Sequence, residues 1–161
     1  MAIEIYSPVG ADPEETHTDA RFRLGQCAEG SDNSEWVYVQ ADAGGITDAG
    51  YVVLFDENYA ADMVDTTNSA TAFGQKVGVA AIAFAASEYG WVQVKGKASI
   101  RVGANAAANA ALNTTATAGE LDDDGTVGAE VVDGVILTTA NGGSAANAEG
   151  LLNWPTIGAT L

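Results

Sequence analysis

Short apolar runs separated by turn residues form the main pattern of this chain from residue 22 onward. The clearest runs are residues 35–41 (EWVYVQA), 51–55 (YVVLF), 77–85 (VGVAAIAFA) and 131–139 (VVDGVILTT). Their lengths, their β-branched and aromatic residues and the Gly, Asp and Asn residues around them are typical of β-strands. Only residues 104–112 (ANAAANAAL) favour a helix, of a turn or two at most, because they lack a large apolar stripe. The pattern predicts a mainly β fold, a small β-barrel or β-sandwich with little helix.

The longest alternation runs over residues 91–102 (WVQVKGKASIRV). Read as one strand, it separates an apolar face from a second face that carries Trp91, Gln93, Lys95, Lys97, Ser99 and Arg101. A two-residue hairpin turn at Lys95 and Gly96 would mix apolar and polar side chains on both faces, so a continuous strand is favoured. We expect this strand to cross the whole domain, with Gly96 allowing a bend or a bulge midway.

Charge raises a question about this strand. The chain has 22 acidic and six basic residues and a formal net charge of -16, yet three of the basic residues lie on the second face. Lys95, Lys97 and Arg101 could neutralise acids on neighbouring strands of the same chain. They could also form an interface with an acidic copy or another acidic subunit, with Trp91 as an anchor, and the two explanations are not exclusive. The acidic surface disfavours binding to nucleic acid or to an anionic membrane.

Residues 1–20 differ from the rest, since they hold five acids, two prolines and the single histidine. Their apolar character rests on a few positions, chiefly Ile3, Ile5 and Tyr6. We predict an extended N-terminal arm over residues 1–20 that docks through these side chains on a neighbouring subunit, and a β-rich domain over residues 21–161. Because Val, Ile, Leu and Phe together number only 34, the core is expected to be thin and to depend on partners.

Candidate chemistry is sparse. His17 lies in the acidic arm, and Cys27, the single cysteine, is expected to be a small buried residue. There is no HExxH motif, phosphate-binding loop or nucleophile elbow, and no apolar run or signal sequence that would indicate a membrane or an export route. Residues 122–125 (DDDG) are the best candidate cation site but lack the spacing of an EF-hand. We expect no enzyme, no metal and no cofactor; a small hydrolase that uses a carboxylate pair or the turn at residues 122–124 stays an alternative.

Four stretches in order carry a resemblance to a known family: residues 73–80 (FGQKVGVA), 89–96 (YGWVQVKG), 112–121 (LNTTATAGEL) and 134–137 (GVIL). Their succession, over roughly residues 22–155, resembles the head decoration or capsid cement proteins of tailed bacteriophages. In that group G-x-x-V-G-V-A is followed by Y-G-W-V-Q-V-x-G and by an alanine-rich stretch that ends in T-A-G. The resemblance implies a structural β protein, made in the host cytoplasm and carried on the outer surface of the capsid. It further implies binding to the major capsid protein and assembly with copies of itself, often as a homotrimer.

Specific residues follow from this resemblance as expectations. The apolar residues of the arm would dock on the major capsid protein or on a neighbouring copy, and Trp154 would pack against the barrel or a neighbour. The residues expected at or near a subunit interface are Trp91, Lys95, Lys97 and Arg101. The alternative function is a β-sandwich glycan-binding module, with an exposed aromatic platform made of Trp36, Tyr38 and Trp91.

Overall fold

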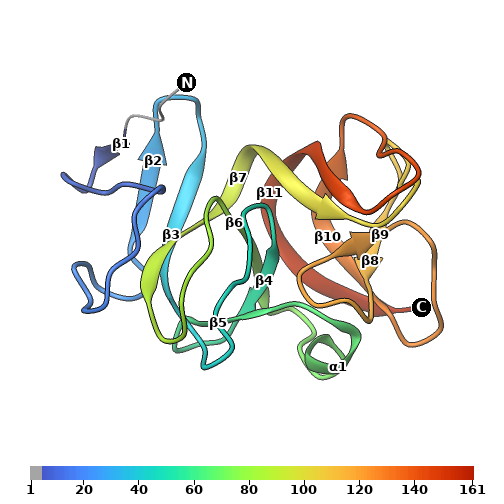
Figure 1. Cartoon of the computed structure of the whole chain (residues 1–161), viewed down its shortest axis with the longest axis horizontal. Helices are drawn as coiled ribbons and strands as arrows, with labels where there is room; N and C mark the ends of the chain where they lie inside the picture. The colour runs from blue at the N-terminus through green and yellow to red at the C-terminus, as the bar shows by residue number, and fades with distance from the viewer. Residues whose placement is uncertain (1–4) are drawn as a thin grey trace.

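The structure is a computed structural model that describes residues 5–161 and is mainly β (Figure 1). The strands are β1 (Ile5–Ser7), β2 (Cys27–Gly30), β3 (Glu35–Ala41), β4 (Val52–Phe55), β5 (Ala60–Met63), β6 (Lys76–Ala80), β7 (Tyr89–Val102), β8 (Leu112–Thr114), β9 (Leu121–Asp122), β10 (Glu130–Leu137) and β11 (Ala146–Thr160). The described part of the chain has a single short helix, α1 (Thr66–Ser69). No helix in that part is long and apolar enough to cross a membrane.

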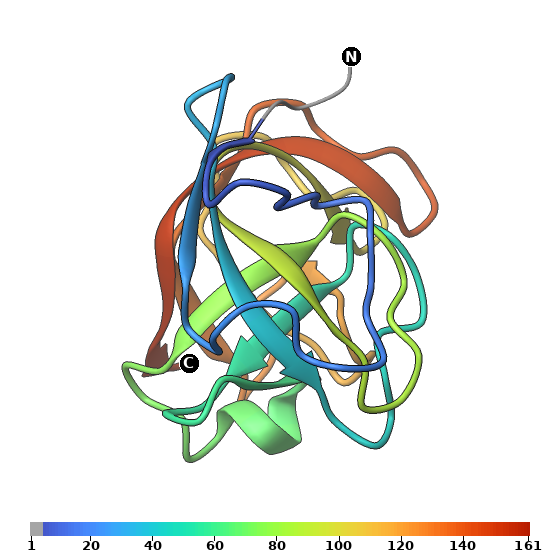
Figure 2. The same ribbon diagram turned by 90° about the vertical axis from the view of Figure 1, so that its left-hand side faces the viewer.

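The strand pairings close into two rings that share β7. In the first ring β3 pairs with β7, β7 with β6, β6 with β4, β4 with β5, and β5 with β3. In the second ring β7 pairs with β11, β11 with β10, β10 with β8, β8 with β9, and β9 with β7. Figure 2 looks along the molecule from the end that carries the N-terminal residues. The mainly β, barrel-like fold with little helix is therefore confirmed, and ring closure leaves few free strand edges.

The expected continuous strand is confirmed as β7, which links the two rings. Its first half pairs with β3, and its second half pairs with β11 from Lys95 opposite Asn153 to Val102 opposite Ala146. Gly96 lies just after the change of partner and has a φ of 94°, and the register against β3 shifts shortly before it, between Gln93 and Lys95. A bend or bulge at Gly96 was the sequence-based expectation, and the structure has it.

Each ring encloses its own apolar core because β7 turns the same alternating face inward along its whole length. Val92 and Val94 enter the first core, and Ala98, Ile100 and Val102 enter the second. The first core is completed by residues of β3, β4 and β6 with Ile46 and Phe84. The second is completed by residues of β8 to β11 and by the opposite face of β4 and β6, which carries Val52, Leu54, Val77 and Val79. The first half of β7 is buried on its other face as well.

One expectation about an element was wrong, and one element was missed. Residues 104–111 form turns instead of a helix, with Asn105 and Asn109 in the left-handed region at φ 65° and 61°. Asparagine reaches this conformation more readily than most residues, so it stops the helix that alanine favours. The longest strand, β11, was not predicted at all, since glycines and Pro155 interrupt its apolar pattern.

Candidate interaction surface

The outer face of β10, β11 and the second half of β7 carries Lys97, one of the three cations that the charge pattern singled out. Leu151 in the central strand lies opposite Ile136 of β10 on one side and Lys97 of β7 on the other. In the next row of this face Glu149 lies opposite Ser99. Leu151 is 47% exposed and Ile136 36%, so this face presents apolar side chains to solvent beside charged ones. We call these five residues the β10–β11–β7 face.

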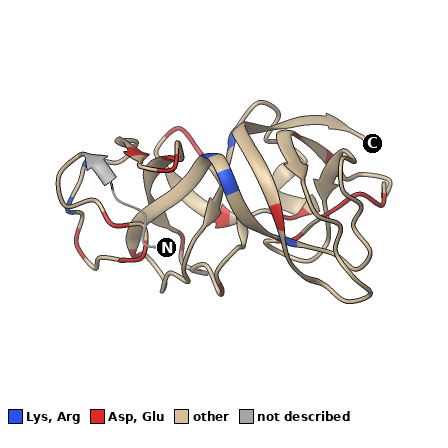
Figure 3. Ribbon diagram, turned by 90° about the horizontal axis from the view of Figure 1, so that it is seen from above, with Lys and Arg blue, Asp and Glu red and all other residues tan. Residues whose placement is uncertain are grey.

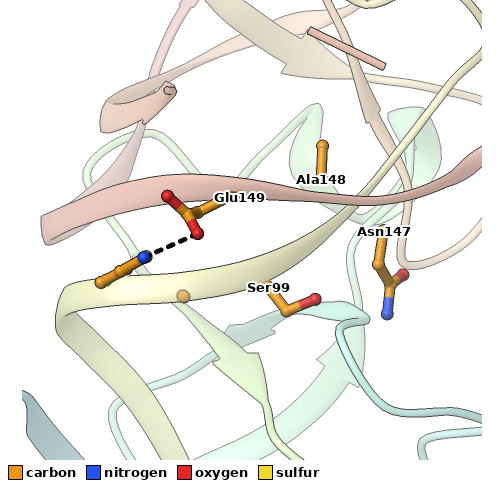
Figure 4. Close-up of a pocket in the computed structure, with 6 residues that line it drawn as sticks. Ser99, Asn147, Ala148 and Glu149 are labelled. Atoms are coloured by element: carbon orange, nitrogen blue, oxygen red, sulfur yellow. Dashed lines mark ion pairs between the residues drawn. The ribbon is translucent and has the colours of Figure 1, made fainter. Parts of the chain in front are cut away.

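A hollow of about 580 Å³ runs along the ladder between β7 and β11 (Figure 4). Its lining combines small and polar residues: Lys97, Ala98, Ser99, Asn147, Ala148 and Glu149. Ser99 is the small exposed side chain of this lining, whereas Ala98 and Ala148 are buried and belong to the second core. The hollow therefore belongs to the same surface and gives it room for a side chain from another molecule.

The three cations of β7 each pair with an acid of the same chain. Lys95 binds Glu35 of β3, Lys97 Nζ lies 2.7 Å from Glu149 Oε2, and Arg101 Nε lies 3.2 Å from Glu120 Oε2. The ion pair of Glu149 is drawn dashed in Figure 4. The first sequence-based explanation, neutralisation within the chain, is therefore correct for all three.

These three ion pairs leave the negative charge unevenly distributed over the molecule. Three acids and three bases cancel along β7, so the net charge of -16 resides in the remaining 19 acids and three bases of the sequence. Figure 3 shows basic segments near the middle of the molecule and acidic segments spread over its loops. The β10–β11–β7 face, with one Lys and one Glu, is neutral on an otherwise acidic protein.

Glu35 joins the two rings at the point where β7 changes partner. One of its carboxylate oxygens accepts the bond from Lys95, and the other accepts a 2.8 Å hydrogen bond from Trp154 Nε1 of β11. The hydrogen bond from Lys95 holds the pKa of Glu35 below its usual value, and the bond from Trp154 acts in the same direction. Trp154 packs against the first core, and the Lys76 ammonium lies 5.9 Å from the centre of its ring.

Trp91 is buried, not exposed as its place in the alternation predicted. It is 1% exposed, and its ring centre lies 5.1 Å from that of Phe22 and 5.0 Å from that of Tyr38. Trp36 and Tyr38 are buried in the same cluster. An exposed aromatic platform made of these residues is therefore wrong, because other side chains pack against them: Ala11, Phe22, Leu24, Ala81 and Tyr89.

The described part of the N-terminal segment lies on its own chain. His17 exchanges two backbone hydrogen bonds of 2.8 Å with Tyr89, and its Nδ1 lies 2.8 Å from the hydroxyl of Tyr38. Ile3 lies outside the described residues, as do the side chains of Ile5 and Tyr6, whose backbone forms β1. Docking of the arm on a neighbouring subunit therefore stays a prediction.

Two further positions were singled out in the sequence, the single cysteine and the candidate cation site at residues 122–125. Cys27 lies on the surface, and Asp122 is partly buried. Cys27 is exposed, contrary to expectation, because the alternation of β2 turns Ala28 inward and Cys27 outward. Asp122 ends β9, and burial raises its pKa above the usual value. Asp123 accepts a 3.2 Å bond from the backbone of residue 107. Within residues 5–161 no three His, Cys, Asp or Glu side chains gather where they could hold a metal ion.

The motifs that carry the family resemblance form the centre of the fold. Gly90 is the second residue of β7, where an added Cβ would lie 2.6 Å from the ring of Phe84. Gly119, in the motif that ends in T-A-G, has a φ of 79°, and its Cβ would lie 2.5 Å from the ring of Tyr51. The physical role of Gly90 and Gly119 is thus to allow close packing of strands and loops.

No protein-family model matches the chain, and neither does any curated protein.

Proposed function

We propose that this protein is a structural virion component that binds the outer surface of a phage capsid and cements neighbouring major capsid protein subunits. The ordered succession of the four motifs carries this proposal. The fold is compatible with it, because Gly90 and Gly119 of these motifs occupy positions where a side chain would collide with an aromatic ring. At these two positions the motifs meet a local packing requirement of this β fold, so part of the motif pattern has a structural reason.

The closed strand rings are also compatible with a structural role. Closed strand rings resist deformation and offer few edges for unwanted strand pairing. The single histidine is 4% exposed, and through its bond to Tyr38 it holds residues 11–21 on the aromatic cluster. We propose the major capsid protein and copies of this chain as partners, and the virion exterior as the location.

The decisive experiment is the copy number of this chain relative to the major capsid protein in gradient-purified particles, measured by quantitative mass spectrometry. A ratio near one to one, or a fixed fraction set by the lattice, is the expected result. A trace amount, or loss of the chain during the gradient, would overturn the proposal. As a control, an abundant host protein quantified in the same fractions sets the level of contamination.

A second measurement tests cementing separately from binding. Heads that lack this chain are incubated with the purified protein, then heated, and release of DNA is followed with an intercalating dye. The release temperature should rise on addition of the protein and should stop rising when all sites are filled. Binding without any rise would mean that the protein decorates heads but does not stabilise them.

A further inference from the structure

The β10–β11–β7 face is the one place in the described chain where exposed large apolar side chains lie side by side on strands. Ile136 and Leu151 are directly opposite each other across β10 and β11. The other exposed large apolar residues of residues 8–161 belong to turns or to the C-terminus: Val9, Phe73, Val127 and Leu161. An apolar pair on a strand surface, bordered by charges and a hollow, is typical of a protein contact.

The charges of this face identify the partner. Two copies of the chain, each with a formal net charge of -16, repel one another through most of their surfaces. This face is neutral, because Lys97 and Glu149 lie side by side on it. A surface with one positive and one negative charge can be complementary to itself. We propose that the β10–β11–β7 face is a two-fold contact between two copies of this chain.

The register of the strands provides the geometry. Leu151 and Lys97 face each other in one row and Glu149 and Ser99 in the next, so the four residues form a parallelogram. A two-fold axis that lies in the plane of the contact, along the diagonal from Leu151 to Ser99, brings Leu151 of each copy together. The same axis places Lys97 of one copy against Glu149 of the other.

The contact then contains four charges of alternating sign. Each Lys97 keeps the Glu149 of its own chain and gains the Glu149 of the second copy, so no charge is left unpaired. The two Leu151 side chains become buried in the centre, and the hollow beside Ser99 leaves the two faces free to approach. An apolar centre with a charged rim is the usual anatomy of a protein interface.

The first test is the oligomeric state of the purified full chain by sedimentation velocity from micromolar to near-millimolar concentration. The wild type should show a monomer–dimer equilibrium, and Leu151→Asp should raise the dissociation constant by about tenfold or more, because two carboxylates would meet at the axis. Val127→Asp is the matched control, since Val127 is more exposed but lies in a turn away from this face. A monomeric wild type, or equal effects of the two substitutions, would overturn the proposal.

A charge-exchange test examines the two-fold geometry itself. Lys97→Glu gives a face with two negative charges and Glu149→Lys a face with two positive ones, so each variant alone should be monomeric at about 0.1 M salt. An equimolar mixture of the two should form heterodimers, because every charge that crosses the interface then meets its opposite. A mixture that stays monomeric while the wild type dimerises would refute this pairing of residues 97 and 149.

The proposal does not rest on the capsid function, since it requires only the chain itself. A homotrimer whose assembly is unaffected by Leu151→Asp would overturn it, while leaving binding to heads untouched. Conversely, a dimer that never associates with particles would support the contact and count against the capsid function. The two conclusions are therefore separable by experiment.

Discussion

Glu35 offers a sharp test of how the two rings are joined. Its carboxylate binds Lys95 of β7 and Trp154 of β11 and thus connects β3 to both strands that extend into the second ring. Replacement by Gln preserves size and can still accept a neutral hydrogen bond from Trp154, but it removes the charge. We therefore expect Glu35→Gln to destabilise the fold without unfolding it.

The expected loss of unfolding free energy depends on how far solvent reaches the ion pair between Glu35 and Lys95. The side chain of Glu35 is 23% exposed and that of Lys95 43%, so solvent screens this ion pair and its contribution is about 0.5–1 kcal/mol. Turning the bond from Trp154 into a neutral one removes roughly another 0.5–1 kcal/mol. The sum, about 1–2 kcal/mol, corresponds to a fall in Tm of roughly 2–8 °C for a domain of this size.

The pH dependence separates this mechanism from a packing defect. Because the pKa of Glu35 is lowered in the folded state, its stabilisation is fully present above the unfolded value of about 4.5 and is lost as pH falls through the folded pKa. The difference in unfolding free energy between wild type and Glu35→Gln should thus be full at about pH 7 and shrink at about pH 3.5. Urea unfolding followed by tryptophan fluorescence measures it at both values.

Glu149 provides the matched control, since it also pairs with a lysine and its pKa is also lowered, chiefly by the hydrogen bond from Lys97. Its side chain is far more exposed than that of Glu35, so Glu149→Gln should change the unfolding free energy less. Equal losses for the two variants, or a Glu35→Gln difference that is the same at both pH values, would refute the reasoning.

Two further predictions concern buried positions. Tyr38→Phe removes the hydroxyl that lies 2.8 Å from His17 Nδ1, so residues 11–21 should be cut faster in limited proteolysis while the barrel stays intact; an unchanged rate would contradict the role of this bond. Gly90→Ala would place a methyl group against the Phe84 ring and should lower the unfolding free energy by about 1–3 kcal/mol, whereas Gly142→Ala, with open space around it, should leave the urea midpoint unchanged.

The sequence predicts those parts of the fold whose signal is local. β3, β4 and β7 appear as uninterrupted apolar or alternating runs, and the bend at Gly96 follows from one residue within such a run. β11 escapes prediction because its glycines and Pro155 resemble a loop, although its backbone is paired along most of its length with β7 and β10. The ring closures could not be predicted, since they depend on pairings between distant segments.

The candidate surface was predictable only in part, for the same reason. The alternation identified the cations of β7 but not their partners, since Glu35 lies 60 residues before Lys95. It also placed Trp91 on the outer face without indicating that Phe22 would cover it. A side chain on the outer face of one sheet is exposed only if no other segment packs there, and that is a long-range property. Leu151 and Ile136 escaped notice because their exposure depends on the register of β11 against β10.

The distribution of charge links the fold to assembly. A net charge of -16 keeps copies of the chain apart wherever their acidic loops would meet. Along β7 the chain places half of its basic residues and pairs each with an acid from a neighbouring strand or loop, so repulsion is weakest there. Within that neutral region Leu151 and Ile136 supply the apolar area that favours association. The strand that holds the two rings together thus also determines which surface is available for contact with another molecule.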